Sequence, residues 1–358
     1  MRVKLEDVCE RGSSNLKQSD VVEMTGDYPI YGASGYIGNV DFYHQENPYV
    51  AVVKDGAGIG RTTLHPAKSS VIGTMQYLLP KDNVLPKYLY YVVSYMRLEK
   101  YFTGATIPHI YFKDYKNEKF NLDSLEKQKE IVDALGKCDA VIEYRKQELQ
   151  WLDELIKARF VEMFGDPVYN TNDFPIRNLN ELGNWASGGT PSRTVPEYFK
   201  GNIDWYSAGE LNTLFLEGSV EKITEEAIEK SATKLFKAGS LLIGMYDTAA
   251  FKMGILKEDS ASNQACACIT PNDEVNIIWL YYELQMMKEH FLSQRRGVRQ
   301  KNLNLGMIKA FKIPIAKREQ QDEFSDFVKQ VDKSKVAIQA ALDKSQLLFD
   351  SLMQKYFG

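Results

Sequence analysis

Two long stretches of the chain contain no proline and carry a helical heptad pattern of hydrophobic positions. The first runs from His109 to Gly165 and the second from Ile315 to Gly358. In the first, spacings of four and three residues alternate at Ile131, Leu135, Cys138, Ile142, Arg145, Leu149, Leu152, Ile156, Arg159 and Met163. The second repeats the spacing at Phe324, Val328, Val331, Lys335, Ile338, Leu342, Ser345, Phe349, Leu352 and Tyr356. A heptad sustained over this length predicts two coiled-coil helices of roughly 35 residues and about 50 Å each.

We expect the two helices to satisfy each other, most simply as an antiparallel pair, because they match in length and pattern. The expected coiled-coil and partner interface comprises Ile131, Leu135, Ile142, Leu149, Leu152, Ile156, Phe324, Val328, Val331, Ile338, Leu342 and Phe349. Asp123 and Ser124 are candidate N-caps of the first helix, and Gly165 with Pro167 should end it. The alternative is that each helix is amphipathic and buried against its own domain.

The two helical stretches are copies of one sequence. Without any gap, the segment from Glu126 to Gly165 aligns with the segment from Glu319 to Gly358, at an offset of 193 residues (Gly358 against Gly165). The alignment also extends back to Ile110, which falls on Leu303. A single duplication of this kind predicts two equivalent modules and a pseudo-twofold molecule, whereas a solenoid needs three or more short repeats.

The rest of the chain has the pattern of short β-strands separated by turns. Typical runs are 49–53, 75–79, 241–245 and 265–269, with Gly, Asn, Asp and Pro between them. We therefore expect an α+β fold in which two β-rich domains are joined by two long antiparallel coiled-coil helices. The expected limits are 1–120 and 166–314 for the domains, and 121–165 and 315–358 for the helices.

Composition narrows the class of protein. Among 358 residues, 44% are hydrophobic and 26% are charged, as in soluble globular chains, and no apolar run approaches the 18 residues of a membrane span. The N-terminus lacks an apolar signal core, and the four cysteines form no CxxC pair, so we expect a cytoplasmic protein without disulfides or structural zinc. The net charge of −4 argues against coating nucleic acid by bulk charge but leaves room for a local basic face.

Motifs of catalysis are weak or missing. The glycine run at 56–60 is one residue short of a dinucleotide-binding turn, and Pro66 forbids the helix that must follow, so we expect a tight β-turn. Asn47, Pro48 and Tyr49 lack the second proline of the adenine methyltransferase loop. The sequence contains no phosphate-binding loop and no metalloprotease or hydrolase motif. We therefore expect no cofactor, no metal and no catalytic residue.

A chemistry of recognition remains. The stretch 293–302 interleaves four cations with amides and contains no carboxylate. Its candidate DNA-binding residues are Arg295, Arg296, Arg299, Gln300 and Lys301, since Arg and Lys suit guanine or phosphate and Gln suits adenine. The equivalent stretch in the first half, 101–110, is less basic but contributes Thr106 and His109. Different residues at equivalent positions would suit the recognition of two different sequences, although either stretch could be only a solvated loop.

Several stretches resemble the specificity subunit of Type I restriction-modification systems. Residues 182–192, with Gly188, Gly189 and Thr190, look like the opening element of a target-recognition domain, and 196–205 look like the element that follows. Residues 239–243 and 262–265 match its core strands, and 28–38 resemble a variant opening in the first half. On this resemblance, the further candidate DNA-binding residues are Thr190, Ser192, Arg193, Asn263 and Gln264.

The resemblance implies a DNA-recognition subunit without catalytic activity. Each β-rich domain would enter the major groove of double-stranded DNA and read one half of a bipartite target. The helices would set the spacer and dock two methyltransferase subunits, and restriction and translocase subunits would join through the complex. The partners would use S-adenosylmethionine and ATP. Two alternatives from other classes are a coiled-coil adaptor whose domains bind protein, and a self-contained methyltransferase or nuclease, for which the sequence shows no active site.

Overall fold

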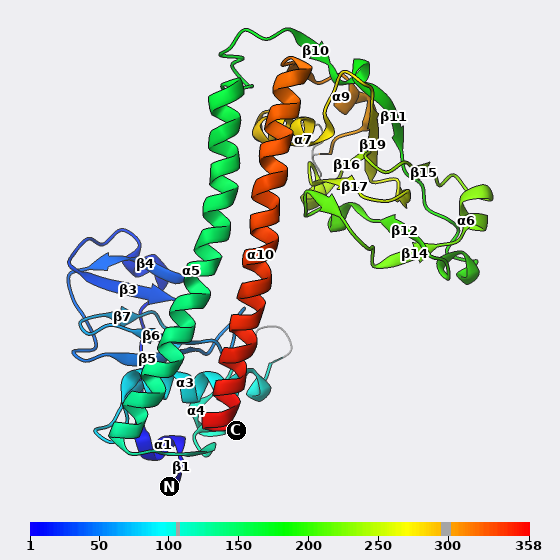
Figure 1. Cartoon of the computed structure of the whole chain (residues 1–358). Helices are drawn as coiled ribbons and strands as arrows, with labels where there is room; N and C mark the ends of the chain where they lie inside the picture. Colours follow the sequence, from blue (N-terminus) through cyan, green and yellow to red (C-terminus); the bar gives the residue numbers. More distant parts are fainter. Residues whose placement is uncertain (105–107, 295–301) are drawn as a thin grey trace. The chain divides into compact units, whose positions relative to one another are not determined.

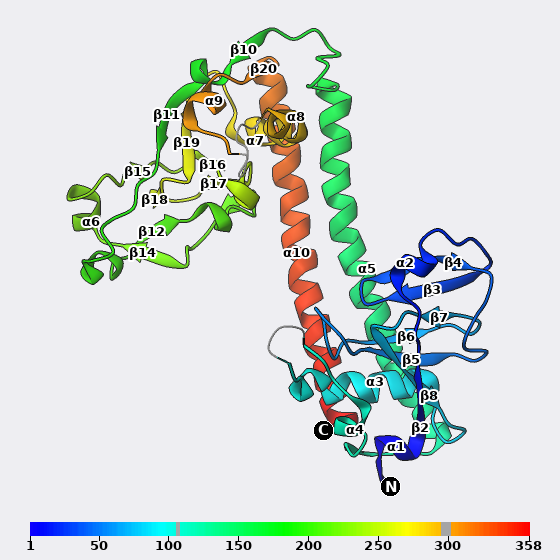
Figure 2. The same cartoon turned by 180° about the vertical axis from the view of Figure 1, so that it is seen from behind.

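The computed structural model describes residues 1–104, 108–294 and 302–358. They form two compact units, one of residues 1–147 and 339–358 (unit 1) and one of residues 148–338 (unit 2). Both long helices run through both units. Figures 1 and 2 show the elements of each unit, which are described here one unit at a time.

The two predicted helices are present. Helix α5 spans Leu125–Phe164 and helix α10 spans Arg318–Phe357, with 40 residues each. The hydroxyl of Ser124 accepts a hydrogen bond from the backbone N–H of Lys127 and so caps α5 as predicted. At the other end, Gly165 takes a left-handed conformation (φ 73°), which ends the helix in the way that a glycine at this position commonly does.

The helices pack antiparallel within each unit. In unit 1, Ile131 and Leu135 near the start of α5 share a core with Met353 near the end of α10. In unit 2, the ring of Phe160 near the end of α5 lies 5.4 Å from that of Phe324 near the start of α10. All predicted interface positions are buried or half-buried. The buried ones are Ile131, Leu135, Ile142, Ile156, Phe324, Val328 and Val331, and the half-buried ones are Leu149, Leu152, Ile338, Leu342 and Phe349.

The globular part of unit 1 holds three sheets. A four-stranded sheet has the order β2-β8-β5-β6, a three-stranded sheet β4-β3-β7, and a two-stranded sheet β1-β9. The strands are β1 (Arg2–Lys4), β2 (Cys9–Ser13), β3 (Tyr28–Gly32), β4 (Gly35–Val40), β5 (Tyr49–Val53), β6 (Thr62–His65), β7 (Ser70–Val71), β8 (Met75–Pro80) and β9 (Lys119–Asn121). The short helices are α1 (Leu5–Val8), α2 (Gln18–Val21), α3 (Pro86–Met96) and α4 (Phe112–Tyr115). One core joins β5, β8 and α3 to both long helices.

Unit 2 repeats this arrangement. Its sheets have the orders β11-β19-β16-β17-β13, β14-β12-β18-β15 and β10-β20. The strands are β10 (Ile176–Asn178), β11 (Gly183–Ser187), β12 (Ile203–Tyr206), β13 (Phe215–Leu216), β14 (Glu221–Ile223), β15 (Leu235–Phe236), β16 (Leu241–Gly244), β17 (Met253–Leu256), β18 (Ser260–Ser262), β19 (Cys266–Pro271) and β20 (Lys312–Pro314). The short helices are α6 (Glu225–Glu229), α7 (Ile277–Met286), α8 (Lys288–Ser293) and α9 (Leu305–Lys309).

The duplication extends to the strands, residue by residue. In unit 1, Val50 of β5 pairs with Leu78 and Leu64 on its two sides. In unit 2, Leu241 of β16 pairs with Ile269 and Ile255, each 191 positions later (Leu241 against Val50). The parallel pairs β3-β7 and β12-β18 also correspond, with Ile30 against Ser70 in unit 1 and Trp205 against Ala261 in unit 2. The fold thus contains two equivalent modules, as the repeated helices predicted.

A duplicated glutamine fixes each long helix to its own globular part. Gln128 and Gln321 are both fully buried. The side-chain oxygen of Gln128 accepts the N–H of Leu85, just before α3, and that of Gln321 accepts the N–H of Asn276, just before α7; both distances are 2.8 Å. Buried amides satisfied in this way hold two elements in one fixed orientation. Each long helix is therefore fixed to its own globular part through an equivalent contact.

Candidate nucleic-acid interface

Each unit presents an equivalent β-hairpin loop that is closed by the same backbone hydrogen bond. In unit 1 the loop of residues 54–61 joins β5 to β6, and in unit 2 the loop of residues 245–252 joins β16 to β17. The N–H of Gly60 donates to the carbonyl of Val53, and the N–H of the equivalent Phe251 donates to that of Gly244, both at 2.8 Å. Gly60 and Phe251 both have positive φ, of 82° and 60°. Residues 56–60 therefore form the predicted turn, and no helix follows them.

In each unit, the segment before a short helix lies against this hairpin loop. The helix is α4 in unit 1 and α9 in unit 2. In unit 1, the N–H of Ile110 donates to the carbonyl of Lys54 at 3.0 Å. In unit 2, the N–H of Leu303 donates to the carbonyl of Met245 at 2.8 Å. Ile110 and Leu303 are both buried and were already aligned by the sequence repeat. In each unit, two loops far apart in sequence thus form one surface.

A side chain reinforces the contact in both units. His109 Nδ1 lies 2.6 Å from the carboxylate Oδ1 of Asp55, which Lys54 also contacts. Burial alone would raise the pKa of Asp55, but the hydrogen bonds from Lys54 and His109 hold that pKa below its ordinary value. In unit 2, Asn302 occupies the position of His109, and its Oδ1 accepts the N–H of Asp247 at 3.0 Å.

Three of the predicted residues in unit 2 lie beside its hairpin loop. The Thr190 hydroxyl hydrogen-bonds the exposed Gln264 side chain, and the carbonyl of Ala265 accepts the N–H of Met245. The Asn263 side chain accepts the N–H of Ala265 and so shapes the turn itself. At Gly188, a Cβ would come within 2.3 Å of the Asn263 carbonyl, so only glycine lets the two segments lie this close.

Arg193 is engaged within the protein. Its guanidinium Nη2 donates to Glu221 at 2.7 Å, and its guanidinium carbon lies 4.2 Å from the centroid of the Phe199 ring and 5.3 Å from that of Trp205. The neighbouring Ser192 hydroxyl contacts Thr194. Because its charge is already paired, Arg193 is poorly suited to contact a phosphate without first leaving Glu221.

The remaining predicted residues, namely Thr106, Arg295, Arg296, Arg299, Gln300 and Lys301, lie outside the described residues. Their sequence neighbours are described. Helix α8 ends at Ser293, and the chain returns at Asn302, which contacts the hairpin loop of unit 2. Ser293 and Asn302, at the two ends of the basic stretch, therefore both belong to the globular part that carries this loop.

Comparison with known proteins identifies the family. Residues 1–154 and 171–346 match the Type I restriction modification DNA specificity domain. The chain belongs to this family. It is 24% identical to the EcoR124I/EcoR124II specificity subunit of Escherichia coli, over 74% of this chain and 68% of that one. It is 23% identical to the MjaVIII specificity subunit of Methanocaldococcus jannaschii, over 83% of this chain and 75% of that one.

A solved structure shares the fold of this specificity-family chain. The Type I restriction-modification S subunit from M. genitalium superimposes with a TM-score of 0.64 at 15% identity, covering 100% of this chain and 96% of the other. The fold predicted from the sequence is confirmed, as is the resemblance to Type I specificity subunits. Family membership also makes the chain a DNA-recognition component rather than a catalytic subunit.

The sequence did not single out the hairpin loops as part of the interface. In unit 1, a signal was available, because three glycines follow a buried strand at Gly56, Gly58 and Gly60. In unit 2, Asp247 and Phe251 have positive φ at the positions of Gly56 and Gly60, and they carry no such signal. The pairing of these loops with residues 108–110 and 302–303 joins segments that lie far apart in the sequence, so no local pattern of the specificity-family chain indicates it.

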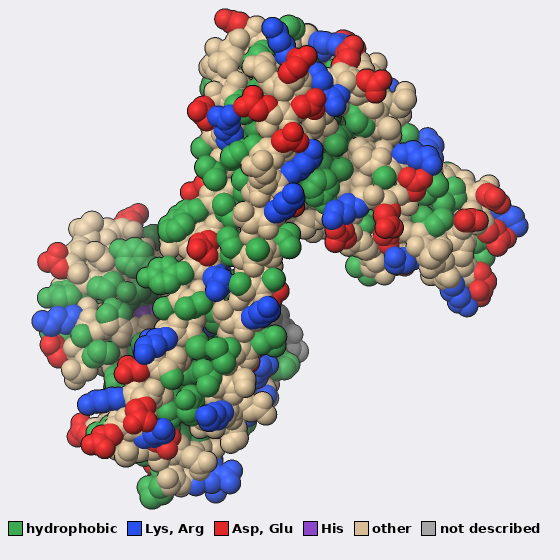
Figure 3. All heavy atoms as spheres, in the orientation of Figure 1, with side chains coloured by type: hydrophobic (Ala, Val, Ile, Leu, Met, Phe, Trp, Pro, Cys, Tyr) green, Lys and Arg blue, Asp and Glu red, His purple; other side chains and the backbone are tan. Residues whose placement is uncertain are grey.

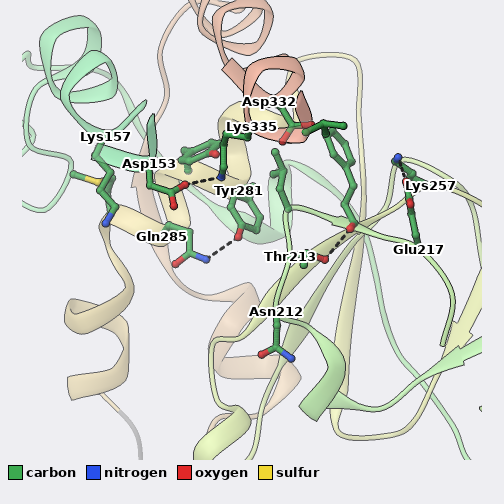
Figure 4. A pocket seen from close by; sticks show the side chains of 15 residues that line it. Asp153, Lys157, Asn212, Thr213, Glu217, Lys257, Tyr281, Gln285, Asp332 and Lys335 are labelled. Carbon is green, nitrogen blue, oxygen red and sulfur yellow. Dashed lines mark hydrogen bonds and ion pairs between the residues drawn. The ribbon is translucent and has the colours of Figure 1, made fainter. Parts of the chain in front are cut away.

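A separate hollow in unit 2 has a different character. It measures about 670 Å³ and lies between the long helices, α7 and residues 212–217 (Figure 4). Lys335 there bonds Asp153 at 2.7 Å, and Lys257 pairs with Glu217. Since two of its three lysines are paired with carboxylates, the hollow is poorly suited to phosphate.

Among the described residues of this specificity-family chain, no helix is both long enough and apolar enough to span a membrane.

Proposed function

We propose that this chain is the specificity subunit of a Type I restriction-modification complex and that each unit reads one half of a bipartite DNA target. The observation that carries the proposal is the duplicated pair of loops. The hairpin loop and the segment before α4 or α9 meet through an equivalent backbone hydrogen bond in both units, yet their exposed side chains differ. Loops that occupy equivalent positions but expose different side chains are what the recognition of two different half-site sequences requires.

The loops have a chemistry that suits the major groove. The tip of the first hairpin carries only the small residues Gly56, Ala57 and Gly58, which allow close approach to a sugar or a base edge. The second tip exposes Tyr246, Asp247 and Thr248 beside Thr190 and Gln264. Amides and hydroxyls hydrogen-bond base edges, and the cations of 295–301 would contact guanine or phosphate.

The long helices would set the distance between the half-sites. Each is continuous over 40 residues, or about 60 Å at 1.5 Å per residue. Each is also fixed to its own globular part by the buried Gln128 or Gln321. A rigid connection of this kind fixes half-site spacing, as the dimer interface does in dimeric DNA-binding proteins.

The outer faces of the helices would receive partner subunits. Apolar side chains reach the surface along both helices, and acidic and basic side chains intermix elsewhere on the face seen in Figure 3. In unit 1 they include Tyr144 (66% exposed) and Leu347 (70%). In unit 2, Trp151 (54%) precedes a groove of about 560 Å³ lined by Leu155, Ala158, Arg159, Glu162 and Phe327. Exposed apolar patches of this kind mark protein interfaces.

The expected partners are two methyltransferase subunits, one for each repeated half, with restriction and translocase subunits bound through them. Such a complex acts on DNA in the cytoplasm. S-adenosylmethionine and ATP would be used by the partners, because the present chain is expected to bind neither. Partner subunits that close around the DNA would also supply phosphate contacts, which fits the net charge of −4.

Single alanine substitutions of Arg295, Arg296, Arg299 and Lys301 in the assembled complex test the proposal. A residue paired with guanine should cost about 1–3 kcal/mol of discrimination at one base pair, whereas a phosphate contact should weaken binding to all sequences and reduce the salt slope by about one. Lys230→Ala, at an exposed lysine after α6, is the control. Unchanged affinity, salt slope and sequence preference in all four variants would contradict the role of this stretch.

A further inference from the structure

The side chains of His109 and Asn302 perform the same task with different chemistry. Both stand immediately before the buried residue that docks on the hairpin loop, Ile110 in unit 1 and Leu303 in unit 2. His109 reaches the side chain of Asp55, whereas Asn302 reaches the backbone N–H of Asp247. The repeat has therefore kept a side-chain bond between the two loops while changing both residues that make it.

These bonds are not needed to bury the core. His109 and Asn302 are only half-buried, and the backbone bonds of Ile110 and Leu303 already attach the segment to the hairpin. In unit 1, the N–H of Gly56 also donates to the carbonyl of Pro108 at 3.1 Å, whereas in unit 2 the equivalent N–H, that of Asp247, donates to the side chain of Asn302. The side-chain bonds of His109 and Asn302 thus add to the backbone attachments of each segment. Each further attachment restricts the directions in which the segment can turn.

On the basis of the proposed function, we propose that His109 and Asn302 are positioning residues. Each fixes the hairpin loop of its own unit and the segment docked on that loop (together the loop pair), and so sets base discrimination in one half-site. In unit 1, Asp55 belongs to the same device, since it accepts the hydrogen bond of His109 and is itself held by Lys54. A base contact depends on geometry within a few tenths of an ångström, so a loosened loop would lose selectivity before it loses overall affinity.

The two units differ in a way that makes the proposal testable. The bond in unit 1 ends on a carboxylate, so Asp55→Ala removes it. The bond in unit 2 ends on a backbone N–H, so it is removed by substitution of Asn302 and not by loss of a partner side chain. The control for Asp55→Ala is Asp82→Ala, at an exposed carboxylate of unit 1 outside both loops.

The experiment uses the variant subunits assembled with their methyltransferase partners and a panel of duplexes carrying single base changes in each half-site. His109→Ala and Asp55→Ala should each lower discrimination about tenfold at one or two positions of one half-site, the size of one lost base contact, and leave the other half-site unchanged. Asn302→Ala should do the same in the other half-site. Asp82→Ala should match the parent protein at every position.

A conservative variant separates positioning from folding. His109→Asn keeps a hydrogen-bond donor at the δ position and should restore most of the lost discrimination, and the thermal unfolding of all variants should match that of the parent. If the parent complex itself shows no sequence preference, the proposed function is wrong. If the parent discriminates but His109→Ala and Asn302→Ala change nothing, or weaken all duplexes equally, the positioning role is wrong and the proposed function stands.

Discussion

Glu283 is a buried carboxyl group in unit 2. It lies on α7, is only 1% exposed, and its Oε1 has no hydrogen bond among the described residues. Burial raises its pKa well above the usual value for a glutamate. The equivalent residue of unit 1 is Val92, which is also buried but apolar. Because unit 1 has an apolar residue at this position, the fold does not require a carboxyl group there.

The raised pKa predicts how the stability of unit 2 depends on pH. The folded state holds the proton of Glu283 more tightly than the unfolded state does, so folding is favoured at low pH and loses stability as pH rises above about 4.3. Glu283→Gln should remove this decline and raise the free energy of unfolding at pH 8 by about 1–3 kcal/mol. Urea unfolding at pH 5 and pH 8 measures it, with the exposed Glu289→Gln as control. Equal pH profiles in parent and variant would contradict the prediction.

Residue type alone did not reveal which predicted contacts are free. Arg193 has the right chemistry for phosphate, but Glu221 and Phe199 occupy its guanidinium in the folded chain. His109 was predicted as a DNA contact, and the structure shows its Nδ1 bonded to Asp55, 54 residues away. Contacts between residues so far apart in sequence depend on the tertiary fold, which local patterns do not specify.

The long helices were predictable because their pattern is local. The heptad and its flanking Ser124 and Gly165 define α5 within the chain itself. The alternative, that each helix is buried against its own domain, also describes the helix ends, since Phe160 and Phe164 of α5 lie outside the heptad positions yet are buried in the core of unit 2. A heptad marks only one stripe of a helix, so the second buried face did not appear in the pattern.

Phe160 tests the importance of this second face. It is fully buried, and its ring lies 5.0 Å from that of Phe164 and 5.4 Å from that of Phe324. Phe160→Ala should lower the free energy of unfolding of unit 2 by about 3–5 kcal/mol, because it removes a core ring and leaves a cavity. The adjacent Val161, which is 46% exposed, should cost no more than about 0.5 kcal/mol when changed to alanine. Denaturant unfolding that shows similar losses for both variants would contradict this account.

The duplication of the globular parts is harder to detect in the sequence than in the strand pairing of the structure. Equivalent residues of the helices keep one offset of 193, but those of the central strands keep 191 (Leu241 against Val50) because the connections differ in length. Few side chains match across the copies, as Gly60 and Phe251 illustrate, although both hold the same left-handed conformation. Backbone hydrogen bonds preserve the strand register without preserving the residues, so sequence comparison alone could not extend the repeat to the sheets.

At the scale of the whole molecule, the two helices are the only elements that belong to both units of the described chain. The division between the units falls after Gln147 in α5 and after Ile338 in α10. The cores of unit 1 and unit 2 draw on opposite ends of these helices, and residues such as Leu149 and Leu342 near the division are only half-buried. The middle of the helix pair therefore carries fewer packing constraints than its ends, and it is the place where the length of the connection can change with the least effect on either core.

Lengthening both helices at this division should change the spacer of the DNA target and nothing else. One heptad inserted after Gln147 and another after Ile338 would keep the 4-3 spacing of both helices and add about 10.5 Å, or roughly three base pairs. The loop pairs lie outside the inserted segments, so both half-site sequences should be retained. Methylome sequencing of cells that carry the variant subunit with its methyltransferase partners would show the target. A heptad inserted into α5 alone is the control, since it shifts one helix past the other and should abolish methylation. Altered half-site sequences, or an unchanged spacer in an active complex, would mean that the helices do not set the distance between the two recognised sequences.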